Sequence, residues 1–206
     1  MTVRRQGGGA SLTSVTATRV WGLEPDPRTR AEPSDQLGDP HSAARKDGGT
    51  ADHKSPRMDE TKALLRHLVA TLAFRTAICV RDAPERFAEF SAGQGVRTPI
   101  EIVRHMTGLL YFSRSLLTGA DRPDIPHAGT WSEAVAALER GMADLDVGIT
   151  NTTAWHSDPR KALQGPLADA LTHTGQLATL RRLAGTPINA GGYPDADIRA
   201  GHLHLR

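Results

Sequence analysis

The sequence has a single cysteine, few aromatic residues and no alternating strand pattern. With Cys79 as its only cysteine, the chain has no intramolecular disulfide, which agrees with a reducing compartment. Aromatic residues make up 4% of its 206 residues, so a core must be built mainly from Leu, Ala and Val. No apolar run approaches the roughly 20 residues that a membrane-spanning helix needs, and the N-terminus lacks the apolar segment of a signal peptide. These absences predict a soluble, cytoplasmic protein with no membrane partner.

An excess of charge of one sign is also missing from most of the chain. Residues 1–57 carry nine Lys or Arg and seven Asp or Glu, whereas residues 58–206 carry sixteen of each. The net charge of +2 therefore comes from the first 57 residues. Despite a sequence pI of 9.0, no basic stripe remains in the rest of the chain, which speaks against nucleic acid as a partner.

Residues 1–57 lack a sustained hydrophobic period. They contain GGG, GG and five prolines, with few large apolar residues, and cannot bury enough surface to offset chain entropy. We predict that they form a disordered extension. Because periodic sequence begins at Met58, this residue is a candidate for the true translation start, with residues 58–206 as the helical domain.

Deletion of residues 1–57 is expected to leave thermal stability nearly unchanged, because apolar periodicity is continuous only in the remaining residues. Thermal melts of the full and shortened chains, followed by circular dichroism, measure this. A fall of several degrees in the melting temperature on deletion would show that the segment docks on the domain.

Four later segments repeat apolar residues at helical spacing. They are residues 59–80, 98–117, 130–149 and 165–185. The second and third open with capping boxes, Thr98 with Glu101 and Thr130 with Glu133. The sequence therefore predicts an all-α fold, a four-helix bundle of about 150 residues. The connections are longer than tight helix-hairpin turns, which permits one crossover.

Each of the first three helices has an apolar stripe that is expected to face the core. In the first helix the stripe consists of Leu64, Leu65, Leu68, Leu72, Thr76 and Cys79. In the second it consists of Ile102, His105, Leu109, Phe112 and Leu116, and in the third of Ala134, Leu138, Met142 and Leu145. Cys79 is thereby expected to be a core residue and not a nucleophile.

The helix expected over residues 165–185 carries Asp169, His173 and Gln176 on its inward stripe. Pro166 suits a first helical turn and Gly185 suits the end of the helix. Asp169 and His173, four residues apart, are neighbours on one face, either as two ligands of one ion or as an ordinary surface ion pair. An unpaired carboxylate on an apolar stripe is costly, which favours a charged partner or a metal.

His105 from the second helix completes a candidate metal site. A lone histidine on such a face is more often a hydrogen-bonded core residue. Beside Asp169 and His173 on a facing helix, however, it supplies the kind of ligand set that bundles place in their interior. Two imidazoles and a carboxylate suit Zn²⁺, Ni²⁺, Fe²⁺ or Mn²⁺ and leave coordination positions open. The same set occurs in non-haem iron oxygenases, which is a third interpretation.

The segments TPIEIVRHM, DALTHTGQLATLRRLAGTP and GGYPDADIRAG resemble the DinB-like superfamily of bacterial four-helix proteins. The resemblance covers about residue 58 to the end. Members place one metal-binding histidine near the start of the second helix, which matches His105. They carry an H-x-x-x-H pair on the fourth helix, and its second histidine, followed shortly by Gly-Gln, matches His173. The middle ligand falls on Asp169, so this sequence departs from three histidines.

The resemblance implies a metal-dependent activity on a small-molecule substrate. In one form the ion lowers the pKa of a low-molecular-weight thiol, as in an S-transferase, and in the other it activates water for hydrolysis. Gln176, one turn beyond His173, is the candidate for binding or orienting the cofactor or substrate, and packing between helices is its plainer role.

Three non-enzymatic interpretations compete with this one. They are a bundle that keeps the site for stability, a dimer-forming stress-induced protein, and a small-molecule or peptide-binding bundle without metal. A homodimer that pairs through exposed helix faces is compatible with a neutral bundle. An enzyme predicts that the three ligands reach solvent, a structural role predicts that they are buried, and a metal-free binding role predicts that His105 and Asp169 point apart.

Overall fold

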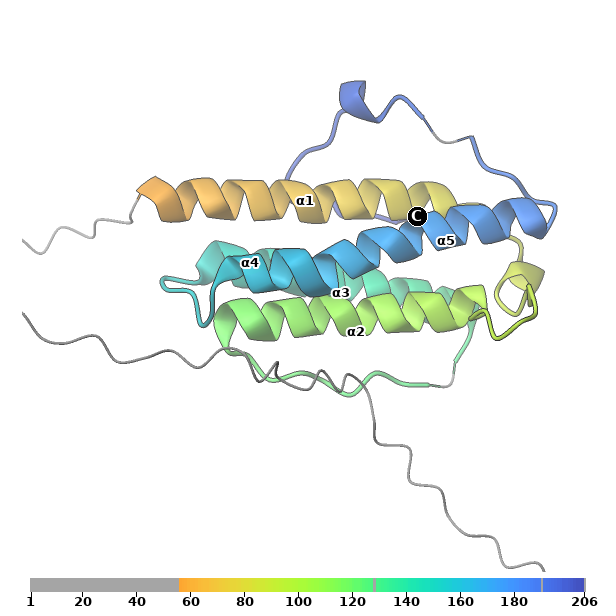
Figure 1. Cartoon of the computed structure of the whole chain (residues 1–206), viewed down its shortest axis with the longest axis horizontal. Coiled ribbons are helices and arrows are strands. Elements are labelled where there is room, and N and C mark those ends of the chain that lie inside the picture. The colour runs from red at the N-terminus through yellow and green to blue at the C-terminus, as the bar shows by residue number, and fades with distance from the viewer. Residues whose placement is uncertain (1–55, 128, 190, 206) are drawn as a thin grey trace, which may run out of the picture. The chain divides into compact units, whose positions relative to one another are not determined.

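The computed structural model describes residues 56–127, 129–189 and 191–205. These residues form four long helices and contain no strand (Figure 1). The long helices are α1 (Pro56–Val80), α2 (Pro99–Thr118), α3 (Trp131–Asn151) and α5 (Ala168–Leu183). The short ones are η1 (Glu85–Phe87), α4 (Pro159–Ala162), η2 (Leu163–Leu167) and η3 (Tyr193–Asp195). The prediction of an all-helical fold is confirmed for the described residues.

The first helix begins earlier than its apolar period suggested. α1 starts at Pro56 and not at Asp59, because proline fits a first helical turn, where a missing N–H has no partner to lose. Pro56 and Arg57 therefore belong to the helix and not to the predicted disordered extension. The rest of that prediction, residues 1–55, lies outside the described residues. A chain started at Met58 would lack the first two residues of α1.

Two partly buried polar contacts hold α1 antiparallel to α3. The Arg66 guanidinium donates to both carboxylate oxygens of Asp146, at 2.8 and 2.9 Å. One turn earlier in α1, the Lys62 ammonium donates to the carbonyl oxygens of Thr150 and Thr152 at the end of α3. A cation there is favoured by the negative end of the helix dipole. Hydrogen bonding to Asp146 raises the pKa of Arg66 above its usual value, which keeps this pair charged.

The connection from α2 to α3, residues 119–130, crosses back along α2. Near the end of α2, Arg114 donates to the carbonyl oxygen of Asp121 at 2.9 Å. Near its start, Arg104 donates to the carbonyl oxygen of Gly129 at 2.7 Å. The chain therefore retraces α2 before α3 begins, so α2 and α3 run in the same direction (Figure 1). This connection is the crossover that the loop lengths permitted.

The core stripe of α3 was predicted correctly, that of α1 was correct at four of its six residues, and that of α2 was correct at Ile102 alone. All four predicted α3 residues are buried. In α1, Leu64 is 72% exposed. In α2, Phe112 is 37% exposed and Leu109 and His105 are half-buried. Ile102 is buried as predicted, and the other fully buried apolar residues in the interior of α2 are Val103, Met106, Leu110 and Leu117. His105 consequently lies at the margin of the core and not inside it.

The last long helix does not start at Gly165-Pro166, as the sequence suggested. It starts with α4 at Pro159, where the Asp158 carboxylate accepts a hydrogen bond from the Arg160 N–H at 3.0 Å. The chain then continues through η2, a π turn, into α5, and Figure 1 shows α4 and α5 as one continuous ribbon. Pro166 lies inside the π turn. Because proline cannot make the regular helical hydrogen bond, a wider local turn accommodates it.

The C-terminal segment returns to the helices. Leu203 and Leu205 are buried. The Glu139 carboxylate in α3 accepts a hydrogen bond from the Leu205 N–H and pairs with His204, both at 3.2 Å. Arg75 of α1 stacks on the ring of Tyr193, 4.1 Å from its centroid. The tail therefore covers part of α1 and α3.

α1 departs from the expectation that no apolar run approaches the length of a membrane-spanning helix. It is the one described helix long and apolar enough to cross a membrane, with a mean hydropathy of 1.5 in its most apolar stretch. Half of that stretch is buried inside the fold, as in the core helix of a soluble protein. Its apolar character is explained by its packing on α3 and α5.

Cys79 lies in the core, as predicted. It is 2% exposed, and its thiol points to the carbonyl oxygen of Thr174, 3.6 Å away. Burial raises the pKa of the thiol to about 11. Since the thiolate is the nucleophilic form, this cysteine is unreactive near neutral pH.

Cys79→Ser is expected to lower the free energy of unfolding by about 1 kcal/mol near neutral pH. Because the folded-state pKa of Cys79 is raised, the wild type should lose stability as the pH rises from about 9 through 11. The serine variant should lack this part of the pH dependence. Urea denaturation at several pH values measures both effects, and an unchanged pH dependence in the variant would contradict the assignment.

Candidate metal centre

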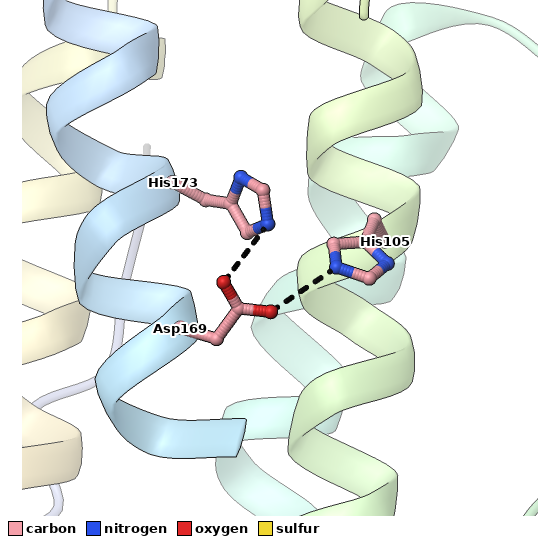
Figure 2. Close-up of side chains that lie close together, drawn as sticks. All are labelled: His105, Asp169 and His173. Atoms are coloured by element: carbon pink, nitrogen blue, oxygen red, sulfur yellow. Dashed lines mark hydrogen bonds and ion pairs between the residues drawn. The ribbon is translucent and has the colours of Figure 1, made fainter. Parts of the chain in front are cut away.

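Three polar side chains from α2 and α5 meet on one side of the helices (Figure 2). The Nε2 atom of His105 is 3.4 Å from one carboxylate oxygen of Asp169, and the Nε2 atom of His173 is 3.4 Å from the other. The two imidazole rings stand edge to face, with centroids 4.7 Å apart. One ligand atom from each residue lies within 4.8 Å of the other two. The predicted convergence of these three residues is confirmed.

Helical segments with well-defined starts place the three side chains. The Glu101 carboxylate accepts a hydrogen bond from the Thr98 N–H at 2.8 Å and sets the start of α2, and His105 follows one turn after Glu101. On the other side, α5 begins directly after the π turn, with Asp169 in its first turn and His173 one turn later. The ligands are therefore held by helices and not by loops, which limits their freedom to move apart.

The site opens to solvent on one side. The His173 side chain is 5% exposed, whereas those of His105 and Asp169 are 34% and 42% exposed. The expectation that Asp169 lies on the inward stripe is therefore wrong, since Asp169 lies at the edge of the face that α5 buries. The openness agrees with the enzymatic interpretation. The metal-free binding interpretation predicted that His105 and Asp169 point apart, and they do not.

The distances within the site are compatible with a metal ion. A charge-assisted hydrogen bond between imidazolium and carboxylate is about 2.7–2.9 Å long, and both pairs here are 3.4 Å, each through a different carboxylate oxygen of Asp169. With one ligand atom taken from each residue, the three atoms lie within 4.8 Å of one another, which is close enough to hold an ion. Two imidazole nitrogens and one carboxylate oxygen are also a donor set that Zn²⁺, Ni²⁺, Fe²⁺ and Mn²⁺ accept.

The environment of His105 favours its neutral form. Burial lowers the pKa of His105, and the nearby His173 and Arg97 lower it further, against the opposing effect of Asp169. The neutral imidazole is the form that binds a metal, because the ligand nitrogen must carry a lone pair. His105 is thereby prepared to act as a ligand near neutral pH.

Gln176 contacts a candidate ligand directly. Its side-chain oxygen lies 2.7 Å from the Nδ1 atom of His173, and the residue itself is exposed. Packing between helices, its plainer role, is therefore wrong. When this oxygen accepts a hydrogen bond from the Nδ1–H group, the lone pair of His173 lies on Nε2, which is the nitrogen that faces Asp169. Gln176 is thus placed to set the tautomer of His173.

Gln176→Ala is expected to weaken metal binding by about 10- to 100-fold, the range for loss of a partner that orients a metal-ligating histidine. Gln176→Glu, which keeps an accepting oxygen, should retain most of the affinity. Competition titrations with a chromogenic chelator measure both variants, and Thr172→Ala, an exposed change on the same helix, serves as the control. Affinities of Gln176→Ala equal to wild type would show that this contact does not support the site.

One feature beside the site was missed in the sequence. A cavity of about 490 Å³ lies between α2 and the crossover, and His105 is part of its wall. No helical period predicts this cavity, because one side of its wall, formed by Arg122, Ile125 and His127, comes from the crossover. Its other principal lining residues are Arg104, Leu109, Phe112, Arg122 and Ile125.

Comparisons of the chain with family models, with curated proteins and with solved structures found no match. Any assignment of function to this chain therefore depends on its own residues. The observation that bears most directly on function is the convergence of His105, Asp169 and His173.

Proposed function

We propose that this protein is a DinB-like, metal-dependent enzyme that activates a low-molecular-weight thiol or water. One divalent ion, Zn²⁺, Ni²⁺, Fe²⁺ or Mn²⁺, is held by His105, Asp169 and His173. The observation that carries the proposal is the convergence of these three side chains, with one ligand atom of each within 4.8 Å of the other two, on a side of the bundle that reaches solvent. The match of His105 and His173 to the metal-binding histidines of that superfamily supports it, as does the crossover between α2 and α3, which leaves both histidines on facing helices.

When bound, the ion supplies Lewis acidity that lowers the pKa of a thiol or water near it. His173, the least exposed ligand, is oriented by Gln176 at 2.7 Å. Asp169 brings the negative charge that offsets part of the charge of the ion. His105, half-buried, forms the border between the metal centre and the cavity beside α2.

The attacking group comes from outside the chain in this proposal. The one cysteine is buried with a raised pKa, so it does not serve as the nucleophile. A small-molecule thiol or water then reacts with a small-molecule substrate at the open side of the site. We place the protein in the cytoplasm, without nucleic-acid or membrane partners and with homodimer formation through exposed helix faces as an accompanying expectation.

The test begins with the metal content of the purified full chain, measured by mass spectrometry of the elements. Metal-loaded protein is then assayed for conjugation of cysteine, glutathione and coenzyme A to 1-chloro-2,4-dinitrobenzene, beside His173→Ala. We expect faster conjugation by the wild type with at least one thiol. Equal rates for both proteins would end the thiol form of the proposal, and the same pair is then compared for hydrolysis of activated esters and amides.

One observation favours a non-catalytic alternative. Asp169 pairs with both histidines, so the cluster is electrostatically satisfied within the protein when one of them is protonated. A bundle that keeps these residues for stability would show no metal dependence of either reaction. It would also unfold at a lower temperature when His105 or His173 is replaced by Ala, whether or not metal is added.

A further inference from the structure

The crossover between α2 and α3 forms one wall of the cavity of about 490 Å³ beside α2, and the cavity is open to solvent. The crossover approaches the helix closely at Gly108, where an added Cβ would lie 3.3 Å from the Cδ1 atom of Ile125. Both of these residues line the cavity. A volume of this size accommodates a small organic molecule. Because His105 also lines it, a molecule in the cavity lies next to the candidate metal centre.

Two arginines bring positive charge to this cavity. Arg104 in α2 is held by its hydrogen bond to the carbonyl oxygen of Gly129 at 2.7 Å. Arg122 in the crossover lies over the ring of Phe112, 4.9 Å from its centroid. Among residues 56–127, 129–189 and 191–205, neither guanidinium forms an ion pair with a carboxylate. Both therefore have donors available for a ligand.

The one carboxylate in the cavity wall is already engaged. Glu101 accepts hydrogen bonds from the backbone N–H and the hydroxyl of Thr98. These bonds hold the pKa of Glu101 below its usual value, so it stays ionised as part of the start of α2. It leaves the cavity with one more cation than anion among its Arg and Glu residues.

The remaining wall combines two imidazoles, those of His105 and His127, with apolar side chains. Leu109 and Phe112 of α2 and Ile125 of the crossover provide the apolar part, and Phe112 is 37% exposed although α2 has a fully buried face. An aromatic ring under a guanidinium group can hold a flat apolar body while the guanidinium group holds an acidic group beside it.

We propose that this cavity binds a small molecule that carries an oxyanion, a carboxylate or a phosphate, on an apolar body. Arg104 and Arg122 bind the oxyanion, and Leu109, Phe112 and Ile125 contact the body. The part of this assignment that makes the cavity the substrate site of the metal centre rests on the proposed function, because His105 is the one residue that belongs to both the cavity wall and the metal centre. The anion site itself requires no metal.

Binding is tested on the full chain by isothermal titration, with metal-free and metal-loaded protein. The probes are benzoate, phenyl phosphate, benzamide and inorganic phosphate. We expect benzoate or phenyl phosphate to bind, and benzamide, which lacks the charge, to bind at least about tenfold more weakly. Inorganic phosphate, which lacks the apolar body, should also bind more weakly than phenyl phosphate. The tighter of the first two probes distinguishes a carboxylate from a phosphate ligand.

Arginine variants test the assignment of the oxyanion. Arg104→Gln and Arg122→Gln should each weaken binding of the preferred probe by about tenfold or more, since each removes a charge-assisted hydrogen bond. Arg182→Gln, an exposed change on α5, should leave it unchanged. If neither cavity variant changes the affinity, or if benzamide binds as tightly as benzoate and phenyl phosphate, the proposal is wrong.

A steric variant tests the cavity without changing charge. Gly108→Leu places a side chain in the cavity and should abolish probe binding, whereas Gly175→Leu, at a site with no atom within 4 Å of an added Cβ, should not. Circular dichroism checks that both variants are folded, and binding by a folded Gly108→Leu variant would also overturn the proposal.

The metal-centre variant separates the two proposals. His173→Ala, measured without metal, should bind the preferred probe as the wild type does. If the wild-type protein binds no metal but the arginine variants still lose the probe, the cavity assignment stands and the proposed function falls. If metal binds and the arginine variants behave as wild type, the cavity assignment falls alone.

Discussion

Asp169→Ala is expected to weaken divalent-metal binding by more than about a hundredfold, beyond the range seen for partners outside the ligand set. The substitution removes the one negatively charged ligand and the residue that lies 3.4 Å from both histidines. The two imidazoles that remain cannot close a three-ligand site. Competition titration with a chromogenic chelator and metal analysis after dialysis measure the loss.

Two controls make this result specific. Asp169→Asn keeps the shape and one oxygen but not the charge, and it should fall between wild type and Asp169→Ala. Asp144→Ala removes a carboxylate of similar exposure from α3 and should bind metal as the wild type does. A titration of Asp169→Ala that matched wild type would take Asp169 out of the ligand set and leave the third position to water or another histidine.

Asp169→Ala should change the stability of the metal-free protein little. The carboxylate is 42% exposed, and exposed ion pairs contribute about 0–1 kcal/mol after screening by water and salt. In the presence of metal, the wild type should melt at a higher temperature than the variant, because only a folded site binds the ion. The difference between the two melts therefore reports binding and not packing.

Leu72→Ala is expected to lower the free energy of unfolding by about 2–5 kcal/mol. Leu72 lies in the middle of α1 and is 1% exposed, so truncation leaves a void among the packed side chains. For a folded unit of about 150 residues this corresponds to a fall of roughly 5–15 °C in the melting temperature. Urea denaturation measures the free energy of unfolding directly. The dependence of that free energy on urea concentration is compared between the variant and the wild type.

Leu64→Ala is the matched control in the same helix. The sequence assigned Leu64 and Leu72 to one apolar stripe, but Leu64 is 72% exposed. Its truncation should cost little, and the higher helix propensity of alanine offsets part of that cost. Equal losses for the two variants would mean that Leu64 is covered in solution, for example by a second copy of the chain.

The existence of the four helices was predictable, and the face that each one buries was less so. In α3 the apolar residues form one stripe, so the core face follows from the period. In α2, Leu109 and Leu110 are adjacent, as are Leu116 and Leu117, so two stripes fit the same sequence. Packing against α3, where a Cβ on Gly141 would contact Leu110 at 3.4 Å, selects the stripe that contains Leu110. This choice depends on the neighbouring helix and cannot be read from α2 alone.

The start of the last helix was assigned to the wrong proline. Two helix-start signals precede α5, Asp158-Pro159 and Gly165-Pro166, and each is typical of a first turn. The first one is used, since Asp158 caps α4. The second lies inside a continuous helix, because a π turn relieves the conflict between Pro166 and regular hydrogen bonding. Local rules do not anticipate such a turn, which depends on the surrounding helices.

The members of the candidate site were predictable, but its surroundings were not. The spacing of Asp169 and His173 and the position of His105 depend on helical geometry, which is regular. The exposure of Asp169 follows from which face of α5 meets α2, and the Gln176 contact from a side-chain conformation. The arginine-lined cavity exists because the crossover lies against α2, and nothing in the local sequence of the crossover indicates where it lies.

The π turn at Leu163–Leu167 has a consequence for how this gene can change. A π turn holds one residue more than the α-helical turn it replaces, so insertion of a single codon into a continuous helix is enough to create it. Each residue turns a regular helix by about 100°, and the wider turn absorbs the extra residue, so α4 and α5 stay in phase and Ala162 stays buried. Deletion of the codon for Gln164 would leave a turn of regular length, but Pro166 would then lie in the interior of a regular α-helix, where its missing N–H and its ring cost about 3 kcal/mol. In-frame loss of one codon here should therefore be selected against for stability, even though it spares every candidate ligand.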